Sequence, residues 1–123
     1  MTAPSWLLLF WVGAAATCAA AITGTILGGR APTAWALIPR TRSAGHGLAG
    51  TLVAGLFAYP LLYGLVFEAM HRSDALTGFA LGAIHALLAF AMSRPLAAPA
   101  AAFRIGAMHV IYGTVCAFLY VTP

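Results

Sequence analysis

Four long apolar runs divide the chain, and they limit its possible folds more than any other feature of the sequence. We place them at residues 5–29, 46–70, 75–93 and 101–121. Each is close to the roughly 20 residues that a helix needs to cross a bilayer, where it satisfies its own backbone hydrogen bonds. The sequence therefore predicts an all-α, polytopic membrane protein, with four transmembrane helices in one domain over residues 1–123.

The composition excludes a small soluble domain. Of the 123 residues, 63% are hydrophobic and 7% are charged, and the mean hydropathy is +0.96. The few polar residues cannot cover the surface of a globule of this size. The exterior is therefore expected to face lipid. The net charge of +4 comes from six arginines. Because these are scattered over the predicted loops, no nucleic-acid partner is expected.

The first run has no basic segment before it and is too long for the core of a signal peptide, so we interpret it as the first membrane helix. Cys18 and Cys116 lie in apolar runs far apart in the sequence. We expect buried thiols there, since no disulfide or zinc-binding pattern is present.

The short connections predict how the helices are arranged. Consecutive helices joined by few residues are usually neighbours, which favours a compact four-helix bundle. Only HRSD, residues 71–74, separates the second and third runs, and this predicts a tight antiparallel hairpin. Pro60 removes a backbone donor inside the second run and predicts a kink there.

The arginines predict the orientation. Five of the six lie in or beside the loops at residues 30–45 and 94–103, and only Arg72 lies on the opposite side. Arginine and lysine are enriched in cytoplasmic loops, so we expect these loops in the bacterial cytoplasm, both termini in the periplasm and the helices in the inner membrane. The aromatic residues expected in interfacial belts are Trp6, Trp11 and Tyr120 on one side and Trp35 on the other.

Small residues recur at a spacing that is typical of helix contacts. A spacing of four places them on one helix face, where they let two backbones approach closely. The contacts expected from the positions of small residues are Gly24, Gly28, Gly47, Thr51, Gly55, Gly78, Gly82, Gly106 and Gly113.

His85 and His109 are the candidate ligand-binding residues, in the segments GAIHALLAF and GAMHVIYG. At about 1.5 Å per residue, both lie roughly 12 Å from the cytoplasmic ends of their runs, so they share a level on adjacent antiparallel helices. His85 shares a face with Gly78 and Gly82, and His109 shares a stripe with Tyr112. Both rings are therefore expected to face protein.

Three interpretations of this pair remain open. Neutral histidines can hydrogen-bond to Tyr112, Thr77 or a backbone carbonyl and hold helices together. Paired histidines also ligate haem b, and a single one can ligate (bacterio)chlorophyll, although adjacent helices lie only about 8–10 Å apart. A proton relay needs a carboxylate at mid-depth, which the sequence does not offer. We expect helix packing without a directly bound cofactor.

A second candidate is the segment EAMHRSD, in which Glu68, His71 and Asp74 are spaced by three. Carboxylate-bridged metal sites use such spacings but combine several of these motifs. We interpret the segment as a hairpin tip, where Glu68 pairs with Arg72 at i, i+4. Ser73 or Asp74 then caps the third helix.

No motif indicates catalysis. The sequence has no serine or cysteine nucleophile with a base, no phosphate-binding glycine loop and no metalloprotease motif, and no charge lies at mid-depth in the predicted helices. We therefore expect neither an enzyme nor an ion-coupled transporter.

The segments DALTGFALGAIHALLAF and AMHVIYGTVCAFLYV combine a polar start, a glycine and a histidine in the third run with His-x-x-Tyr-Gly in the fourth. In these features the chain resembles small four-helix bacterial membrane proteins of unknown function. The resemblance covers about the second half of the chain. It implies the four-helix fold and assigns no activity.

Bulky apolar faces at residues 6–11 and 61–67 favour contact with other integral membrane subunits and with lipids, not with a soluble substrate. The leading hypothesis is a non-catalytic accessory subunit of a larger inner-membrane energy-transducing complex, either a photosynthetic reaction centre–antenna complex or a respiratory one. One alternative is a small b-type haem protein with His85 and His109 as axial ligands. The other is a small transporter or channel.

Overall fold

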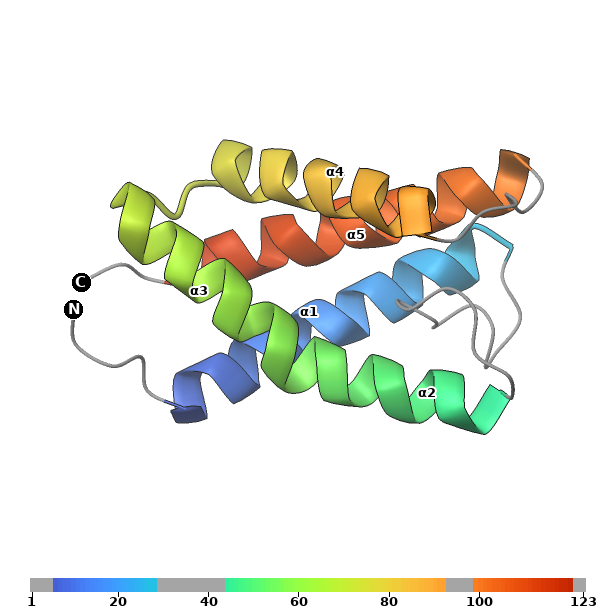
Figure 1. Cartoon of the computed structure of the whole chain (residues 1–123), viewed down its shortest axis with the longest axis horizontal. Coiled ribbons are helices and arrows are strands. Elements are labelled where there is room, and N and C mark those ends of the chain that lie inside the picture. The colour runs from blue at the N-terminus through green and yellow to red at the C-terminus, as the bar shows by residue number, and fades with distance from the viewer. Residues whose placement is uncertain (1–5, 29–43, 93–98, 121–123) are drawn as a thin grey trace.

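The computed structural model describes residues 6–28, 44–92 and 99–120, and every element within these ranges is helical. In chain order the elements are α1 (Trp6–Ile26), α2 (Ala44–Val53), the π-helical η2 (Ala54–Ala58), α3 (Tyr59–Met70), α4 (Ala75–Met92) and α5 (Pro99–Leu119) (Figure 1). Because α2, η2 and α3 follow one another without a break, the described residues form four helical segments. The predicted all-helical fold is confirmed.

Within the described residues, three helical segments are long and apolar enough to cross a membrane. They are Trp6–Ile26, Ala49–Met70 and Ala102–Leu119. The apolar part of α4, Ala75–Ala91, is shorter than these three. Four crossing helices were expected from the sequence, and three segments reach the length that a crossing requires.

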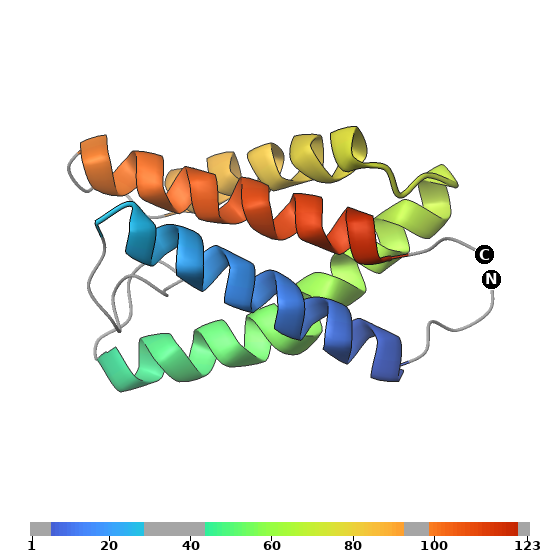
Figure 2. The same ribbon diagram turned by 180° about the vertical axis from the view of Figure 1, so that it is seen from behind.

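Helix α5 lies at the centre of the arrangement. It packs against α4 on one side and α1 on the other, and α1 in turn contacts η2 (Figures 1 and 2). The turn between α3 and α4 lies at the same end of the molecule as the start of α1 and the end of α5 (Figure 1). The main core comes from α1, α3 and α5 and consists of Leu9, Val12, Ala16, Ala20, Tyr63, Phe67, Met108, Tyr112, Cys116, Ala117 and Tyr120.

Helices α3 and α4 diverge from their connecting turn, which corrects the tight hairpin predicted from residues 71–74 (Figure 1). Helix α4 packs along α5 instead, because glycines on both helices allow close backbone approach. A Cβ atom added to Gly78 would lie 2.5 Å from the carbonyl oxygen of Gly113, and one added to Gly113 would lie 2.9 Å from Cα of Gly82. Helix α3 carries large aromatic side chains in this region and offers α4 no comparable surface.

A π-helical turn bends the second segment. The N–H of Tyr59 donates to the carbonyl oxygen of Ala54, five residues earlier. The next bond of this pattern would join residue 60 to Gly55, but Pro60 has no N–H. The helix changes direction at η2, between α2 and α3 (Figure 1). The kink predicted at Pro60 is therefore present, and it begins in the five preceding residues.

Helix α1 ends at Ile26 rather than at residue 29, because Gly28 adopts a left-handed φ of +84°. Among the described residues, no atom lies within 4 Å of the Cβ position of Gly28, so the helix contact predicted there is not found. The small residues that α1 does bury are Gly13, Ala16, Ala20 and Gly24. The sequence pattern missed Gly13, whose Cβ would lie 2.5 Å from Cγ of Pro60 and 2.6 Å from the carbonyl oxygen of Gly55.

The prediction of a buried thiol is wrong for Cys18. Cys18 is exposed on α1, since two residues along a helix turn a side chain to the far side from the buried Ala16. Of the three residues predicted to lie in one interfacial belt, Trp6 and Trp11 are exposed and Tyr120 is 3% exposed. The predictions that fall outside the described residues concern Arg30, Arg40, Arg42, Arg94 and Trp35, together with the surroundings of Gly47.

Candidate functional site

Five polar aromatic side chains meet between α3, α4 and α5, and we call them the Tyr–His cluster. They are Tyr59 and Tyr63 of α3, His85 of α4, and His109 and Tyr112 of α5. The ring centroid of His85 lies 4.3 Å from that of Tyr59 and 4.7 Å from that of His109. The ring of Tyr112 lies 5.8 Å from those of Tyr59 and Tyr63. The cluster thus links three helices through ring contacts.

The two histidines highlighted by the sequence lie in direct contact across α4 and α5, with their ring planes at 73°. His109 is buried and His85 is half-buried. Gly82 makes this contact possible, because a Cβ atom there would lie 2.6 Å from the carbonyl oxygen of His109. A larger residue at position 82 would force the two helices, and with them the two rings, apart.

Hydrogen bonds define the role of each imidazole. Nδ1 of His109 lies 2.8 Å from the carbonyl oxygen of Ile105, and since a carbonyl only accepts, this nitrogen carries the hydrogen and donates it. Nδ1 of His85 lies 3.2 Å from the hydroxyl of Tyr63. The backbone partner of His109 lies on its own helix rather than across the interface. Tyr63 was not among the partners expected for His85.

Tyr112 makes a different kind of contact. Its hydroxyl donates to the carbonyl oxygen of Gly55 at 2.5 Å. This carbonyl is the one that Pro60 leaves without a donor in the π-helical pattern. Proline is tolerated inside apolar helices when a neighbouring helix supplies the missing hydrogen bond. Tyr112 therefore joins α5 to the bend of the second segment.

The geometry does not fit a haem between His85 and His109. Metal–nitrogen bonds of about 2 Å on each side place two axial nitrogens about 4 Å apart, with the imidazole centroids about 6 Å apart or more. The observed centroid separation is 4.7 Å, and the rings meet with no plane between them. Inserting a macrocycle would require separating α4 from α5 at the contacts of Gly78 and Gly82.

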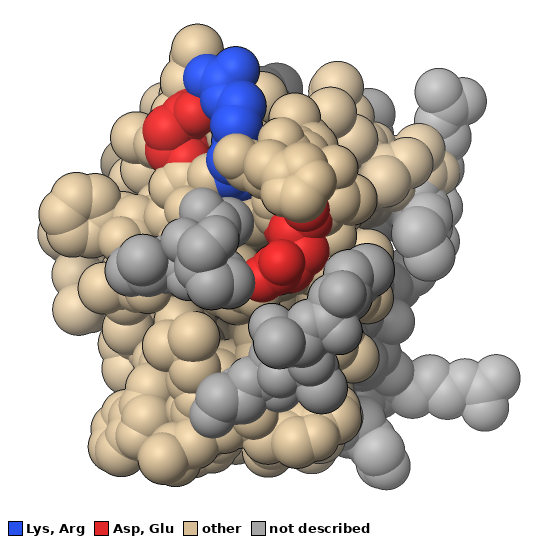
Figure 3. Space-filling model, turned by 90° about the vertical axis from the view of Figure 1, so that its left-hand side faces the viewer, with Lys and Arg blue, Asp and Glu red and all other residues tan. Residues whose placement is uncertain are grey.

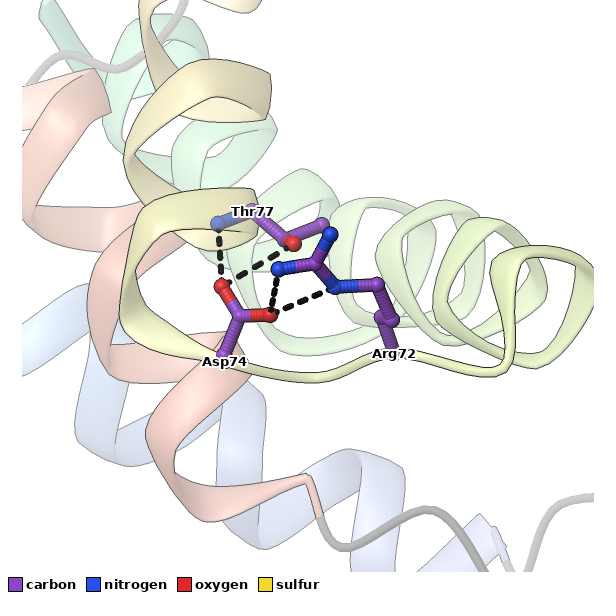
Figure 4. A network of polar contacts seen from close by, with 3 residues as sticks. All are labelled: Arg72, Asp74 and Thr77. Atoms are coloured by element: carbon purple, nitrogen blue, oxygen red, sulfur yellow. Dashed lines mark hydrogen bonds and ion pairs between the residues drawn. The ribbon is translucent and has the colours of Figure 1, made fainter.

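The turn between α3 and α4 holds a compact polar network (Figure 4). Oδ1 of Asp74 accepts hydrogen bonds from the backbone N–H of Thr77 at 2.8 Å and from its hydroxyl at 3.1 Å. The predicted capping of the third helix is thereby confirmed for Asp74. Arg72 pairs with Oδ2 of Asp74 at 2.7 Å. The Thr77 backbone N–H, followed by the Arg72 guanidinium, lowers the pKa of the Asp74 carboxyl below its ordinary value.

The predicted pair between Glu68 and Arg72 is wrong. His71 ends α3 with a left-handed φ of 50°, so Arg72 leaves the helical face that it would need to share with Glu68. Glu68 instead accepts a hydrogen bond from the hydroxyl of Tyr120, at 3.0 Å from its Oε1. Figure 3 views this end of the molecule and shows a basic group beside an acidic one, with a second acidic group nearby.

An apolar groove of about 130 Å³ lies where α3 and α4 diverge. Its lining consists of Leu62, Tyr63, Val66, Leu81, Ile84, His85 and Leu88. The Tyr–His cluster thus reaches the wall of a groove whose other lining residues are aliphatic. Over the described ranges, no three histidine, cysteine or acidic side chains gather as a metal site would require.

The sequence matches no protein-family model, and no similar curated protein or solved structure was found for it.

Proposed function

We propose that the chain is a non-catalytic accessory subunit of a larger energy-transducing complex, photosynthetic or respiratory, in a bacterial inner membrane. The observation that carries this proposal is that the hydrogen-bonded polar side chains lie between the described helices, whereas large apolar side chains cover their outer surface. Inside, the hydroxyl of Tyr112 and Nδ1 of His109 donate to backbone carbonyls, and Tyr63 contacts His85. The contacts of Tyr112 and Tyr63 join different helices, and Tyr63, His109 and Tyr112 are buried.

The exterior carries large apolar side chains on every helical segment. Examples that are about half exposed or more are Trp6, Trp11, Ile22, Phe57, Leu62, Leu76, Phe79, Leu87, Phe103 and Phe118. Such a surface favours lipids and other membrane subunits over water. Helix α4 packs mainly on α5, so its opposite face, with Leu87 at 68% exposure, is the contact surface that we propose for a partner subunit.

The proposed orientation follows from the arginines, with residues 30–45 and 94–103 in the cytoplasm and both termini in the periplasm. The short turn at residues 71–74 then faces the periplasm. The ion pair of Arg72 with Asp74 in this turn leaves no net charge between the two side chains, which suits the less positive side of the membrane.

Purification of the tagged chain in a mild detergent tests the accessory role. We expect a stable assembly that contains further membrane subunits, and a photo-crosslinker at Leu87 should join α4 to one of them. The same crosslinker at the buried Ala86 is the matched control and should not. A stable monomer without co-purifying subunits would contradict the proposal. A Soret band in the purified chain would favour the haem alternative, and ion or solute flux in liposomes would favour a transporter or channel.

A further inference from the structure

Three tyrosine hydroxyls in the described residues have a resolved hydrogen-bond partner, and two of these partners are able to take up a proton. The hydroxyl of Tyr63 lies 3.2 Å from the imidazole Nδ1 of His85. The hydroxyl of Tyr120 donates to the carboxylate of Glu68 at 3.0 Å. Imidazole and carboxylate are the bases that proteins use near neutral pH, whereas the backbone carbonyl bound by Tyr112 is not a useful base.

This difference matters for oxidation. A phenol that loses one electron becomes a strong acid, so its oxidation is far easier when the proton leaves at the same time. The proton needs an acceptor within hydrogen-bond distance, and both Tyr63 and Tyr120 are only 3% exposed to solvent. The hydrogen bonds to His85 and Glu68 supply that acceptor in each case.

We propose that Tyr63 and Tyr120 are redox-active tyrosines. Each gives one electron to a one-electron oxidant outside the chain, of the class of aromatic radical cations or high-valent metal complexes, which is thereby reduced. The phenolic proton moves along the existing hydrogen bond, to Nδ1 of His85 or to Oε1 of Glu68, and leaves a neutral tyrosyl radical. Return of an electron to the radical brings the same proton back.

Aromatic contacts connect the two tyrosines. The ring centroid of Phe67 lies 5.7 Å from that of Tyr120 and 6.0 Å from that of Tyr63. Tyr120 follows the last residue of α5, and its partner Glu68 lies in the last turn of α3. Tyr120 can therefore be oxidised first, at the end of the molecule that carries the α3–α4 turn. An electron from Tyr63 in the Tyr–His cluster can then pass through Phe67 to Tyr120.

One neighbour of His85, the ring of Tyr59, attracts the transient positive charge. Proton transfer to Nδ1 requires the tautomer with hydrogen on Nε2, and we assign that tautomer to His85. The product is an imidazolium whose ring centroid lies 4.3 Å from that of Tyr59, inside the distance at which aromatic rings attract cations. The proposed activity goes beyond the accessory role, and apart from the external oxidant its electron donors and proton acceptors are residues of this chain.

Electron paramagnetic resonance on the full chain in lipid nanodiscs tests the proposal. A ruthenium tris-bipyridine sensitiser with persulfate supplies the oxidant by flash photolysis, and ring-deuterated tyrosine identifies a tyrosyl signal by narrowing it. We expect the radical in the wild type and in the control Phe103→Leu, which replaces an aromatic side chain of α5 that is 69% exposed and lies outside the Tyr–His cluster. The double variant Tyr63→Phe/Tyr120→Phe should lose the signal.

Two further measurements test whether the phenolic proton moves when the tyrosine is oxidised. In a Tyr120→Phe background, His85→Phe should slow formation of the Tyr63 radical about tenfold or more, as a barrier higher by ~1.4 kcal/mol implies. In the unsubstituted chain, radical decay should be slower in D₂O than in H₂O, and this measurement needs no variant to fold. The proposal is overturned if the wild type gives no tyrosyl signal or if the double variant gives an undiminished one. It is also overturned if the radical decays at the same rate in D₂O and in H₂O.

Discussion

The hydroxyl of Tyr112 donates a hydrogen bond to the carbonyl oxygen of Gly55, which lies inside the π-helical turn. This single bond joins the centre of α5 to the bend of the second segment. It also satisfies the carbonyl that Pro60 leaves without its helical donor. The bend and the tyrosine therefore depend on one another, and several measurable consequences follow from this and from the other contacts.

Replacing Tyr112 with Phe should destabilise the protein by about 1 kcal/mol, because the carbonyl oxygen of Gly55 then stays buried without a donor. Reversible unfolding in mixed detergent micelles, followed by circular dichroism, measures the change. The control is a double-mutant cycle with Pro60→Ala, which restores a backbone N–H at residue 60. If the effects of the two substitutions simply add, the proposed relationship is wrong.

Gly13→Ala should destabilise the fold by about 1–3 kcal/mol, as overpacking typically does. The added Cβ would lie 2.6 Å from the carbonyl oxygen of Gly55 and 2.9 Å from that of Leu56, and backbone atoms move aside less readily than flexible side chains. Gly106→Ala is the matched control, since its Cβ would meet only the ring of Phe90, at 3.7 Å. That control should be neutral or stabilising by up to about 1 kcal/mol. Equal effects at both positions would contradict the packing described here.

His71→Gly should stabilise the protein by about 1 kcal/mol. The residue ends α3 with a φ of 50°, a conformation that costs an ordinary residue about 1–2 kcal/mol and glycine almost nothing. Part of this gain is offset by the greater freedom of glycine in the unfolded chain. His71→Ala removes the same imidazole and keeps a Cβ, so it should not stabilise. Thermal unfolding of both variants distinguishes backbone relief from loss of the side chain.

Asp74 should make stability depend on pH in the acidic range. The hydrogen bond from the Thr77 backbone N–H, followed by that from Arg72, lowers the pKa of Asp74 in the folded protein. Because this pKa is lowered on folding, ionised Asp74 stabilises the protein fully at a pH above its pKa in the unfolded chain, about 3.9. The stabilisation is lost as the pH falls through the pKa of Asp74 in the folded protein. Stability should therefore decline below about pH 4.

The comparison with Asp74→Asn isolates the contribution of Asp74 from that of the other carboxyl groups. The variant keeps a side chain that caps helices well but loses the charge. We expect the difference in unfolding free energy between the two proteins to shrink as pH is lowered from 7 to 3. A difference that stays constant over this interval would show that the carboxylate charge contributes nothing.

Local features of the fold were predictable from the sequence, and most contacts between distant residues were not. The helical runs and the cap by Asp74 depend on neighbouring residues, so composition and spacing indicate them. The predicted pair of Glu68 with Arg72 failed because His71 ends the helix in a left-handed conformation, which non-glycine residues rarely adopt. Nothing in the local sequence indicates that exception.

The candidate site was predictable in the same limited sense. Equal depth and inward faces brought His85 and His109 to attention, and their rings do meet. The partner of His85 was not predicted, because Tyr63 comes from a helix that touches α4 little along its length. The contact of Gly13 with Pro60 likewise depends on the bend, which no spacing of small residues reveals.

The π-helical turn also lets the second segment hold one residue more than a regular helix of the same rotation. Five residues, Ala54–Ala58, occupy a turn that is wider than that of an α-helix. Because a wider turn rotates less per residue, these five residues cover about the same rotation as four residues of an α-helix. Thr51 before the turn and Tyr63 after it, at 2% and 3% exposure, therefore both keep their side chains in the interior. The turn absorbs one extra residue without changing which faces of the segment are buried.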